Sequence, residues 1–175
     1  YSWNIFKYEQ IRSVSIYSYP ELSKEFEDIM QLEAIGTIAD LMPMTGENRL
    51  IVKKGLKLLS SKPALAFPYL FSKQNLIGKQ LVAKDISYRV APVINASGRM
   101  GRPSEALKLL LTNNFNEAED LTDILLSLNS DRQNMEEDAM SLVMPKASES
   151  LKENEGKFIV IDDDRIPRGL TGALA

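Results

Sequence analysis

Apolar residues recur at three- and four-residue steps along much of the chain, the spacing that places them on one face of an α-helix. The strongest pattern predicts one long helix over residues 117–144, where no glycine or proline interrupts the sequence. Its seam positions are Leu121, Leu125, Leu128, Arg132, Met135, Ala139 and Leu142. At about 1.5 Å per residue such a helix would reach roughly 40 Å. This is longer than a typical core helix, so we expect it to join two lobes.

Shorter patterns predict further helices before the long one. One covers residues 21–35, directly after Pro20, and a second covers residues 47–60. A third helix is predicted to begin at Ser104, because serine is a favoured N-cap residue. The N-terminal two-thirds of the chain is therefore expected to be largely helical.

The apolar run at residues 158–161 (FIVI) follows a polar stretch and predicts a buried strand. A strand followed by one helical turn is too short to form a domain alone. We therefore predict an α/β fold that is mostly helical in this chain, with a long helix between two lobes. The predicted divisions are residues 1–115 for the first lobe, 116–145 for the connecting helix and 156–175 for the start of the second lobe.

Composition excludes several kinds of chemistry. The 175 residues include no cysteine, which excludes disulfides and thiolate metal sites, and no histidine. Any catalysis by these residues must therefore use carboxylates, lysine, tyrosine or hydroxyl groups. No apolar run approaches the roughly 20 residues of a membrane span. The chain lacks a starting Met and a secretion signal, so we expect it to begin inside a longer protein. The lack of cysteine is compatible with a reducing cytoplasm, the location that we expect.

The formal net charge of −3 means that binding to a nucleic acid would need a local basic surface. The clearest candidate is residues 94–104 (INASGRMGRPS), because no acidic residue occurs between Ile86 and Ser104. We expect this segment to be a loop that leads into a helix, and such a place suits an anion.

Four features of this arginine loop favour a phosphate group. Arg99 and Arg102 can each donate two hydrogen bonds to phosphate oxygens, and Asn95 can donate from its amide. The two glycines let backbone N–H groups converge, and the following helix would add the positive end of its dipole. The alternative is a structural turn whose arginines pair with surface carboxylates.

Asp40 is a candidate metal ligand. It lies among apolar residues between Gly36 and Pro43, and a buried lone carboxylate would be costly unless a cation such as a divalent metal compensated it. The alternative is an ordinary helix cap or turn residue, since one aspartate alone is weak evidence.

Three further groups of polar residues are candidates for a site. Adjacent carboxylates such as Asp162, Asp163 and Asp164 occur in phosphoryl-transfer sites, but neighbouring side chains on an extended segment point in opposite directions, so we do not expect a metal cluster here. Residues 168–172 (RGLTG) suit a phosphate better, because a glycine-containing turn opens a helix there. Arg132 and Asn129 could serve a ligand, although a polar seam position more often fixes helix register.

Several of these segments, in this order, resemble the RecJ-type single-stranded-DNA exonucleases of the DHH phosphoesterase superfamily. The resemblance covers about residues 28–175, and the asparagine–arginine loop is its specific part. The matching residues are 36–40 (GTIAD), 46–49 (GENR), 89–101 (RVAPVINASGRMG), 128–129 (LN) with 132–133 (RQ), and 168–172, which are similar to the opening of the DHH-associated lobe.

The resemblance implies a fold, an activity and a set of site residues. Residues 1–115 would be the C-terminal part of the DHH catalytic domain, and 156–175 the start of the DHH-associated domain. The parent protein would use two divalent ions, usually Mn²⁺ or else Mg²⁺, to hydrolyse phosphodiester bonds of single-stranded DNA in repair and recombination. Asp40 would be one metal ligand. Asn95, Arg99 and Arg102 would hold a phosphate of the strand, and Arg168 with Thr171 would close the groove from the other lobe.

The chain departs from the family pattern, because the motif that names the superfamily contains histidines and this chain has none. We therefore expect the chain alone to lack nuclease activity. The alternatives are another superfamily phosphodiesterase acting on oligonucleotides or cyclic dinucleotides, a catalytically silent repair or replication scaffold, and a helical domain whose arginine loop binds an acidic partner. The sequence predicts no oligomeric state.

Overall fold

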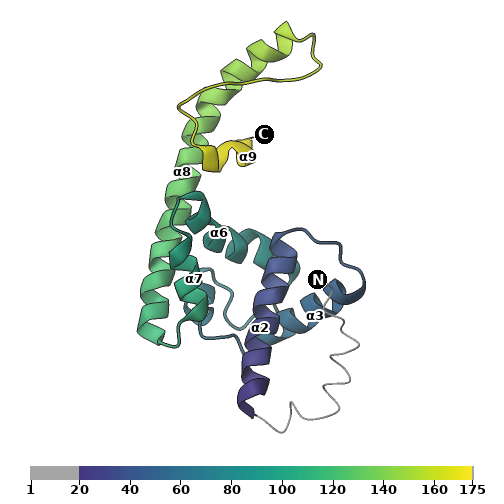
Figure 1. Ribbon diagram of the computed structural model, residues 1–175, viewed down its shortest axis with the longest axis vertical. Coiled ribbons are helices and arrows are strands. Elements are labelled where there is room, and N and C mark those ends of the chain that lie inside the picture. The colour runs from purple at the N-terminus through teal and green to yellow at the C-terminus, as the bar shows by residue number, and fades with distance from the viewer. Residues whose placement is uncertain (1–19, 175) are drawn as a thin grey trace. The chain divides into compact units, whose positions relative to one another are not determined.

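Helices and the irregular segments that join them make up the computed structural model, which describes residues 20–174 (Figure 1). No strand occurs within these residues. The elements are α2 (Pro20–Ala39), α3 (Gly46–Ser61), α4 (Pro68–Lys73), α5 (Ala83–Asp85), the π-helical turn η2 (Ile86–Val90), α6 (Ala91–Arg99), α7 (Pro103–Leu111), α8 (Phe115–Glu153), the 3₁₀ turn η3 (Arg168–Leu170) and α9 (Thr171–Leu174).

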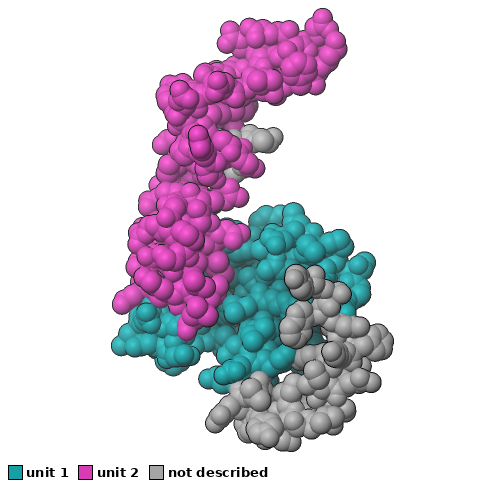
Figure 2. Space-filling model, viewed as in Figure 1, with its two compact units in different colours: residues 1–92, 112–119 teal, residues 93–111, 120–175 magenta. Residues whose placement is uncertain are grey.

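The chain divides into two compact units, which Figure 2 shows in different colours. The first unit comprises residues 1–92 and 112–119, and the second comprises residues 93–111 and 120–175. The predicted mostly helical architecture is confirmed. The assignment of residues 1–115, 116–145 and 156–175 to separate parts of the protein stays a prediction.

In the first unit, α2 and α3 pack closely because a glycine lies where they meet. A Cβ atom built on Gly55 of α3 would lie 2.2 Å from the Cβ atom of Ala34 and 2.8 Å from the carbonyl oxygen of Met30 in α2. Ala34 is fully buried and Leu59 is 1% exposed, so this contact lies in the core of the unit. Both predicted helices are confirmed, and α2 continues four residues beyond its predicted end, to Ala39.

A buried glutamine fixes the chain where it leaves α3. Gln31 of α2 is only 1% exposed. Its Nε2 atom donates to the carbonyl oxygen of Lys62 at 3.2 Å, and its Oε1 atom accepts from the backbone N–H of Ala64 at 2.8 Å. Both polar ends of the side chain are therefore satisfied, which removes the cost of burying an amide.

The long helix of the second half is confirmed, and it is longer than predicted. Helix α8 has 39 residues and runs through Pro145 to Glu153, although we expected it to end before this proline. Proline removes one backbone N–H from the ladder and its ring crowds the carbonyl one turn earlier, yet the residues that follow Pro145 are still helical. Asn114 caps the start, since its Oδ1 atom accepts from the N–H of Asn116 at 2.9 Å.

The predicted strand at residues 158–161 is wrong. This segment has no regular secondary structure, and Phe158, Ile159 and Val160 are 56%, 50% and 66% exposed. A strand requires backbone hydrogen bonds to a neighbouring strand, and residues 20–174 contain no such neighbour. Instead, the N–H of Val160 donates to the hydroxyl of Ser150 at 3.0 Å.

The close approach of α2 and α3 makes a testable prediction. Gly55→Ala should lower the free energy of unfolding by about 1–3 kcal/mol, because the added methyl group overpacks the helix contact. Gly36→Ala is the matched control, since Gly36 is also helical and a Cβ atom there would meet nothing within 4 Å. This control should instead gain about 0.5–1 kcal/mol of helix propensity. Chemical denaturation of both variants measures the difference, and equal effects would contradict the packing account.

Candidate phosphate-binding site

The arginine loop is a tight reversal between two helices. Helix α6 ends at Arg99, and Gly101 adopts a positive φ of 72°. The N–H of Arg102 donates to the carbonyl oxygen of Ser97 at 2.7 Å, and the N–H of Gly101 donates to that of Gly98 at 3.2 Å. These two bonds form a Schellman motif, which satisfies the last carbonyls of a helix and favours glycine at the left-handed position.

Two details of the loop differ from the sequence expectation. Asn95 and Arg99 lie within α6 and not in a loop, so Arg99 occupies the negative end of a helix dipole, where a cation is favoured. Ser104 is not the N-cap, because α7 begins one residue earlier, at Pro103. Proline suits the first helical position, where its missing N–H would have no partner in any case.

Arg99 joins this turn to a segment 70 residues away in the sequence. Its Nη1 atom donates to the carbonyl oxygen of Gly169 at 3.0 Å. The backbones also touch, since a Cβ atom on Gly169 would lie 2.5 Å from the carbonyl oxygen of Arg99. Leu170 beside it is 1% exposed. All three residues belong to the second unit, so the turn after α6 and the 3₁₀ turn η3 form one local structure.

The contact places two other predicted site residues beside Gly169. Arg168 begins η3 and Thr171 begins α9, and both are exposed. The hydroxyl of Thr171 donates to the carbonyl oxygen of Arg168 at 2.9 Å. Because a phosphate oxygen accepts hydrogen bonds, Thr171 would have to release this bond to donate to one. Arg168 is the more available of the two.

Arg102 and Asn95 are also exposed. A nitrogen of Arg102 lies 3.5 Å from a carboxylate oxygen of Glu105, and the arginine side chain keeps half of its accessible surface. Exposed pairs of this kind contribute about 0–1 kcal/mol, so a phosphate could compete for the guanidinium group. The alternative reading, arginines paired with surface carboxylates, therefore describes Arg102 but not Arg99, whose partner is a backbone carbonyl.

Asp40 is exposed, so the expectation of a buried carboxylate is wrong. It directly follows α2, and its N–H donates to the carbonyl oxygen of Gly36 at 2.9 Å. A carboxylate at the C-terminal end of a helix is disfavoured by the dipole, and a bound cation would offset that effect. Within residues 20–174 no group of three or more acidic side chains is placed to hold a metal ion. Asp40 as a metal ligand stays a prediction.

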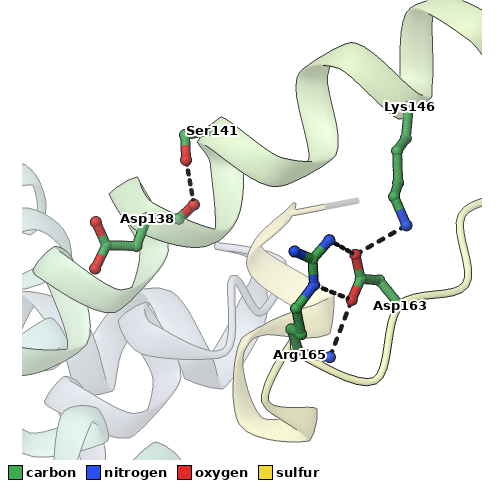
Figure 3. Close-up of polar contacts among 5 residues, drawn as sticks. All are labelled: Asp138, Ser141, Lys146, Asp163 and Arg165. Carbon is green, nitrogen blue, oxygen red and sulfur yellow. Dashed lines mark hydrogen bonds and ion pairs between the residues drawn. The ribbon is translucent and has the colours of Figure 1, made fainter.

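Asp163 is held by two cations (Figure 3). Its carboxylate accepts from Nε and Nη2 of Arg165 at 2.9 and 2.6 Å, and it lies 2.9 Å from Nζ of Lys146 on α8. Hydrogen bonds from Arg165, and then from Lys146, hold the pKa of Asp163 far below its ordinary range. Its neighbours Asp162 and Asp164 are less buried. The contact between Asp163 and Lys146 therefore anchors the segment after α8 to that helix.

Arg132 makes its polar contacts along α8. It pairs with Glu136 one turn later, and its Nη2 atom donates to Oδ1 of Asn129 at 3.3 Å. The side chain is 14% exposed, and its Nε atom is buried without a partner among the described residues. A ligand contact by Arg132 and Asn129 stays a prediction, and so does a role of Arg132 in fixing the register of helix packing.

A second basic region lies outside the arginine loop, and the sequence analysis does not predict it. Residues 48–84 contain no aspartate or glutamate. The signal was present in the sequence as a run of eight cations: Arg49, Lys53, Lys54, Lys57, Lys62, Lys73, Lys79 and Lys84. It was overlooked because these cations are spread over several elements and form no short motif.

Comparison with known proteins gives close matches at both the sequence and the structural level. The single-stranded-DNA-specific exonuclease RecJ of Thermus thermophilus is 37% identical over 144 residues, 82% of this chain and 20% of the relative. RecJ of Salmonella typhimurium is 29% identical over 151 residues, 85% of this chain and 26% of the relative. The crystal structure of the Thermus RecJ with Mn²⁺ matches 85% of this chain and 22% of that chain, with a TM-score of 0.75 and 36% identity.

The chain belongs to the RecJ family. A second Thermus RecJ structure, with Mg²⁺, covers 69% of this RecJ-family chain and 19% of that chain, with a TM-score of 0.63 and 37% identity. The chain thus spans about a fifth to a quarter of the length of the two RecJ relatives compared above. No family model matches it. No helix within the described part of this RecJ-family chain is long and apolar enough to cross a membrane.

The contact between Arg99 and Gly169 predicts a steric effect. Gly169→Ala should lower the free energy of unfolding by about 1–3 kcal/mol, because the added methyl group would force η3 away from the backbone of Arg99. Gly172→Ala is the control, since a Cβ atom at Gly172 would meet nothing within 4 Å. Thermal unfolding of both variants tests the contact. A Gly169→Ala protein as stable as the control would contradict it.

The lowered pKa of Asp163 predicts a pH dependence of stability. The unfolded carboxyl, with a pKa of about 3.9, binds a proton before the folded one does, so stability is lost as the pH falls. The contribution is complete above the unfolded pKa and declines below it. Asp163→Asn should therefore lower the melting temperature at pH 7 and change it progressively less below about pH 4. Asp162→Asn is the control, and a constant difference between wild type and Asp163→Asn down to about pH 2 would contradict the assignment.

Proposed function

We propose that this chain is part of a metal-dependent exonuclease that hydrolyses phosphodiester bonds of single-stranded DNA in repair and recombination in the cytoplasm. The observation that carries the proposal is the contact between Arg99 and Gly169. This contact brings together the cations of residues 94–104 and 168–172, two segments that the sequence predicts as phosphate sites. The similarity to RecJ proteins supports the choice of substrate.

The proposed site holds a phosphate of the DNA strand through fixed positive charge. Arg102 and Arg168 are exposed, and Asn95 lies on the same helix as Arg99. Arg99 gives one N–H to Gly169, and its remaining donors face no acidic partner among the described residues. Guanidinium groups bind phosphate oxygens in pairs and carry no information about the bases. The site would therefore position any single strand, whatever its sequence.

Arg99 has a second role in this proposal. Because its guanidinium group also contacts the carbonyl oxygen of Gly169, it would orient the turn that carries Arg168 and Thr171. Thr171 would donate to the same phosphate after releasing the carbonyl oxygen of Arg168. The energetic cost of that exchange is small, since one hydrogen bond replaces another.

Asp40 is the proposed metal ligand in this chain. Its exposed carboxylate at the end of α2 fits a hard divalent cation such as Mn²⁺ or Mg²⁺, the ions in the related RecJ structures. A pair of such ions supplies an activated water and stabilises the charge that develops on the phosphate. One carboxylate cannot hold two ions, so the other ligands would come from residues outside those described.

The experiment compares DNA binding and cleavage by the full-length protein that carries this chain. With Mn²⁺ it should degrade single-stranded DNA. The Arg99→Ala, Arg102→Ala double variant should bind an oligo-dT strand at least about 100-fold more weakly, since hydrogen bonds to charged groups contribute about 1.5–3 kcal/mol each. Arg102→Ala alone leaves the Gly169 contact intact and should lose about tenfold.

Removal of two exposed lysines elsewhere, Lys84→Ala with Lys152→Ala, is the control for lost positive charge and should change binding by less than about threefold. Equal losses in the two double variants would contradict the phosphate site. A full-length protein that binds the strand but never cleaves it with either metal would favour the catalytically silent scaffold instead.

A further inference from the structure

A surface hollow on the first unit has no part in the site described above. It is lined by one face of α3 and by residues 78–81, and its volume is about 610 Å³. Ligand-binding clefts generally enclose about 300–1,000 Å³. Three lysines line it, Lys53 and Lys57 from α3 and Lys79 from the segment opposite, and we call it the lysine hollow.

The charge of the lysine hollow is not neutralised within the described part of the chain. No acidic residue among residues 20–174 lines the hollow, and all three lysines are exposed. None of them makes an ion pair among the described residues, whereas Lys62, at the end of the same helix, lies 2.9 Å from Glu27. Three cations around one concavity repel one another, and an anion between them would remove that repulsion.

The hollow has a fixed shape. The hydroxyl of Ser60 donates to the carbonyl oxygen of Leu56 in α3 at 2.7 Å and accepts from the N–H of Leu81 at 2.9 Å. Leu81 is 4% exposed, so this end of the segment is packed against the unit. Gly78 takes a positive φ of 73°, which lets the chain turn before Lys79. The lysines therefore project from a preformed surface, which reduces the entropy lost when a ligand binds.

The chemistry of the lining residues identifies the ligand. Lysine offers compact positive charge without the planar fork of arginine, and none of the described residues that line the hollow has an aromatic ring for a base to stack on. Residues 48–84 carry eight cations and no acid within a chain of net charge −3. Such a local excess suits an extended polyanion, whose repeated charges can contact several lysines.

We propose that the lysine hollow binds backbone phosphates of the single-stranded DNA at a second place on the protein, apart from the arginine turn. The inference rests on the proposed function, since it assigns the hollow to the same substrate. It adds a region that holds the strand without taking part in cleavage. The contacts would be strongly dependent on salt and independent of base sequence.

The first test measures oligo-dT binding by the full-length protein in EDTA, where no strand is cut. Lys53→Gln, Lys57→Gln, Lys79→Gln should raise the Kd about 5- to 20-fold in about 50 mM salt and lower the slope of log Kd against log salt by about 2, or roughly 0.7 for each lost phosphate contact. The control is Lys24→Gln, Lys108→Gln, Lys152→Gln, which removes the same charge from exposed positions outside the hollow and outside residues 48–84. It should change the Kd by less than about threefold.

Equal weakening in the two triple variants, or none in either, would overturn the proposal. Cleavage of a tetranucleotide in Mn²⁺ by the variant without the three lysines of the hollow separates this outcome from failure of the proposed function. A strand that short should be cut at the wild-type rate, because in this proposal the lysine hollow takes no part in cleavage. Loss of that cleavage with unchanged oligo-dT binding also contradicts the proposal.

A second measurement uses the wild-type protein and depends on no variant. Bound oligo-dT should protect Lys53, Lys57 and Lys79 from acetylation by a soluble reagent, while Lys54 on the same helix stays reactive. Inorganic phosphate at the same phosphate concentration should protect them much less, because it presents no linked charges. Protection of Lys54 equal to that of the other three, or protection by phosphate equal to that by DNA, would overturn the proposal.

Discussion

The contact between Arg99 and Gly169 is the constraint on which the proposed site depends. One hydrogen bond of 3.0 Å and one backbone approach without room for a side chain join the end of α6 to the 3₁₀ turn η3. Each segment alone offers only one or two exposed arginines. Held together, they place Arg168 and Thr171 on either side of the residue that Arg99 contacts. Gly169 is therefore needed for its lack of a Cβ atom, and Arg99 serves both as a structural donor and as a cation.

Electrostatics divides the chain into regions with different charge. Between residues 48 and 104 the only acidic residue is Asp85, while the segments on both sides are rich in aspartate and glutamate. A net charge of −3 conceals this pattern, because the acidic segments outweigh the basic one in the sum. A single strand of DNA would meet an attractive field over the basic region and a repulsive one elsewhere. Charge distribution can in this way guide the strand before any specific hydrogen bond forms.

Helices α2, α3 and α8 were predictable from the sequence, because each follows from the local spacing of apolar residues. The irregular structure of residues 158–161, where the apolar run predicted a strand, was not predictable, since a strand depends on a neighbour that local sequence does not reveal. The arginine and glycine motifs supplied the candidate site residues, and their setting in the structure differs from the sequence expectation: Asn95 and Arg99 are helical, Ser104 is not a cap and Asp40 is exposed. The bond from Arg99 to Gly169 spans 70 residues, beyond the reach of any spacing rule. The lysine hollow was missed for a similar reason, because it combines α3 with a separate segment, residues 78–81, that follows it in the chain.

The most direct test of the central claim is a crystal structure of the full-length protein with Mn²⁺ and a short single strand that carries an uncleavable phosphorothioate bond. The account predicts a phosphate of the strand within hydrogen-bonding distance of Arg102 and of Arg99 or Arg168, with Arg99 still bonded to Gly169. A strand bound at a distance from these residues, with Arg102 paired only to Glu105, would contradict it.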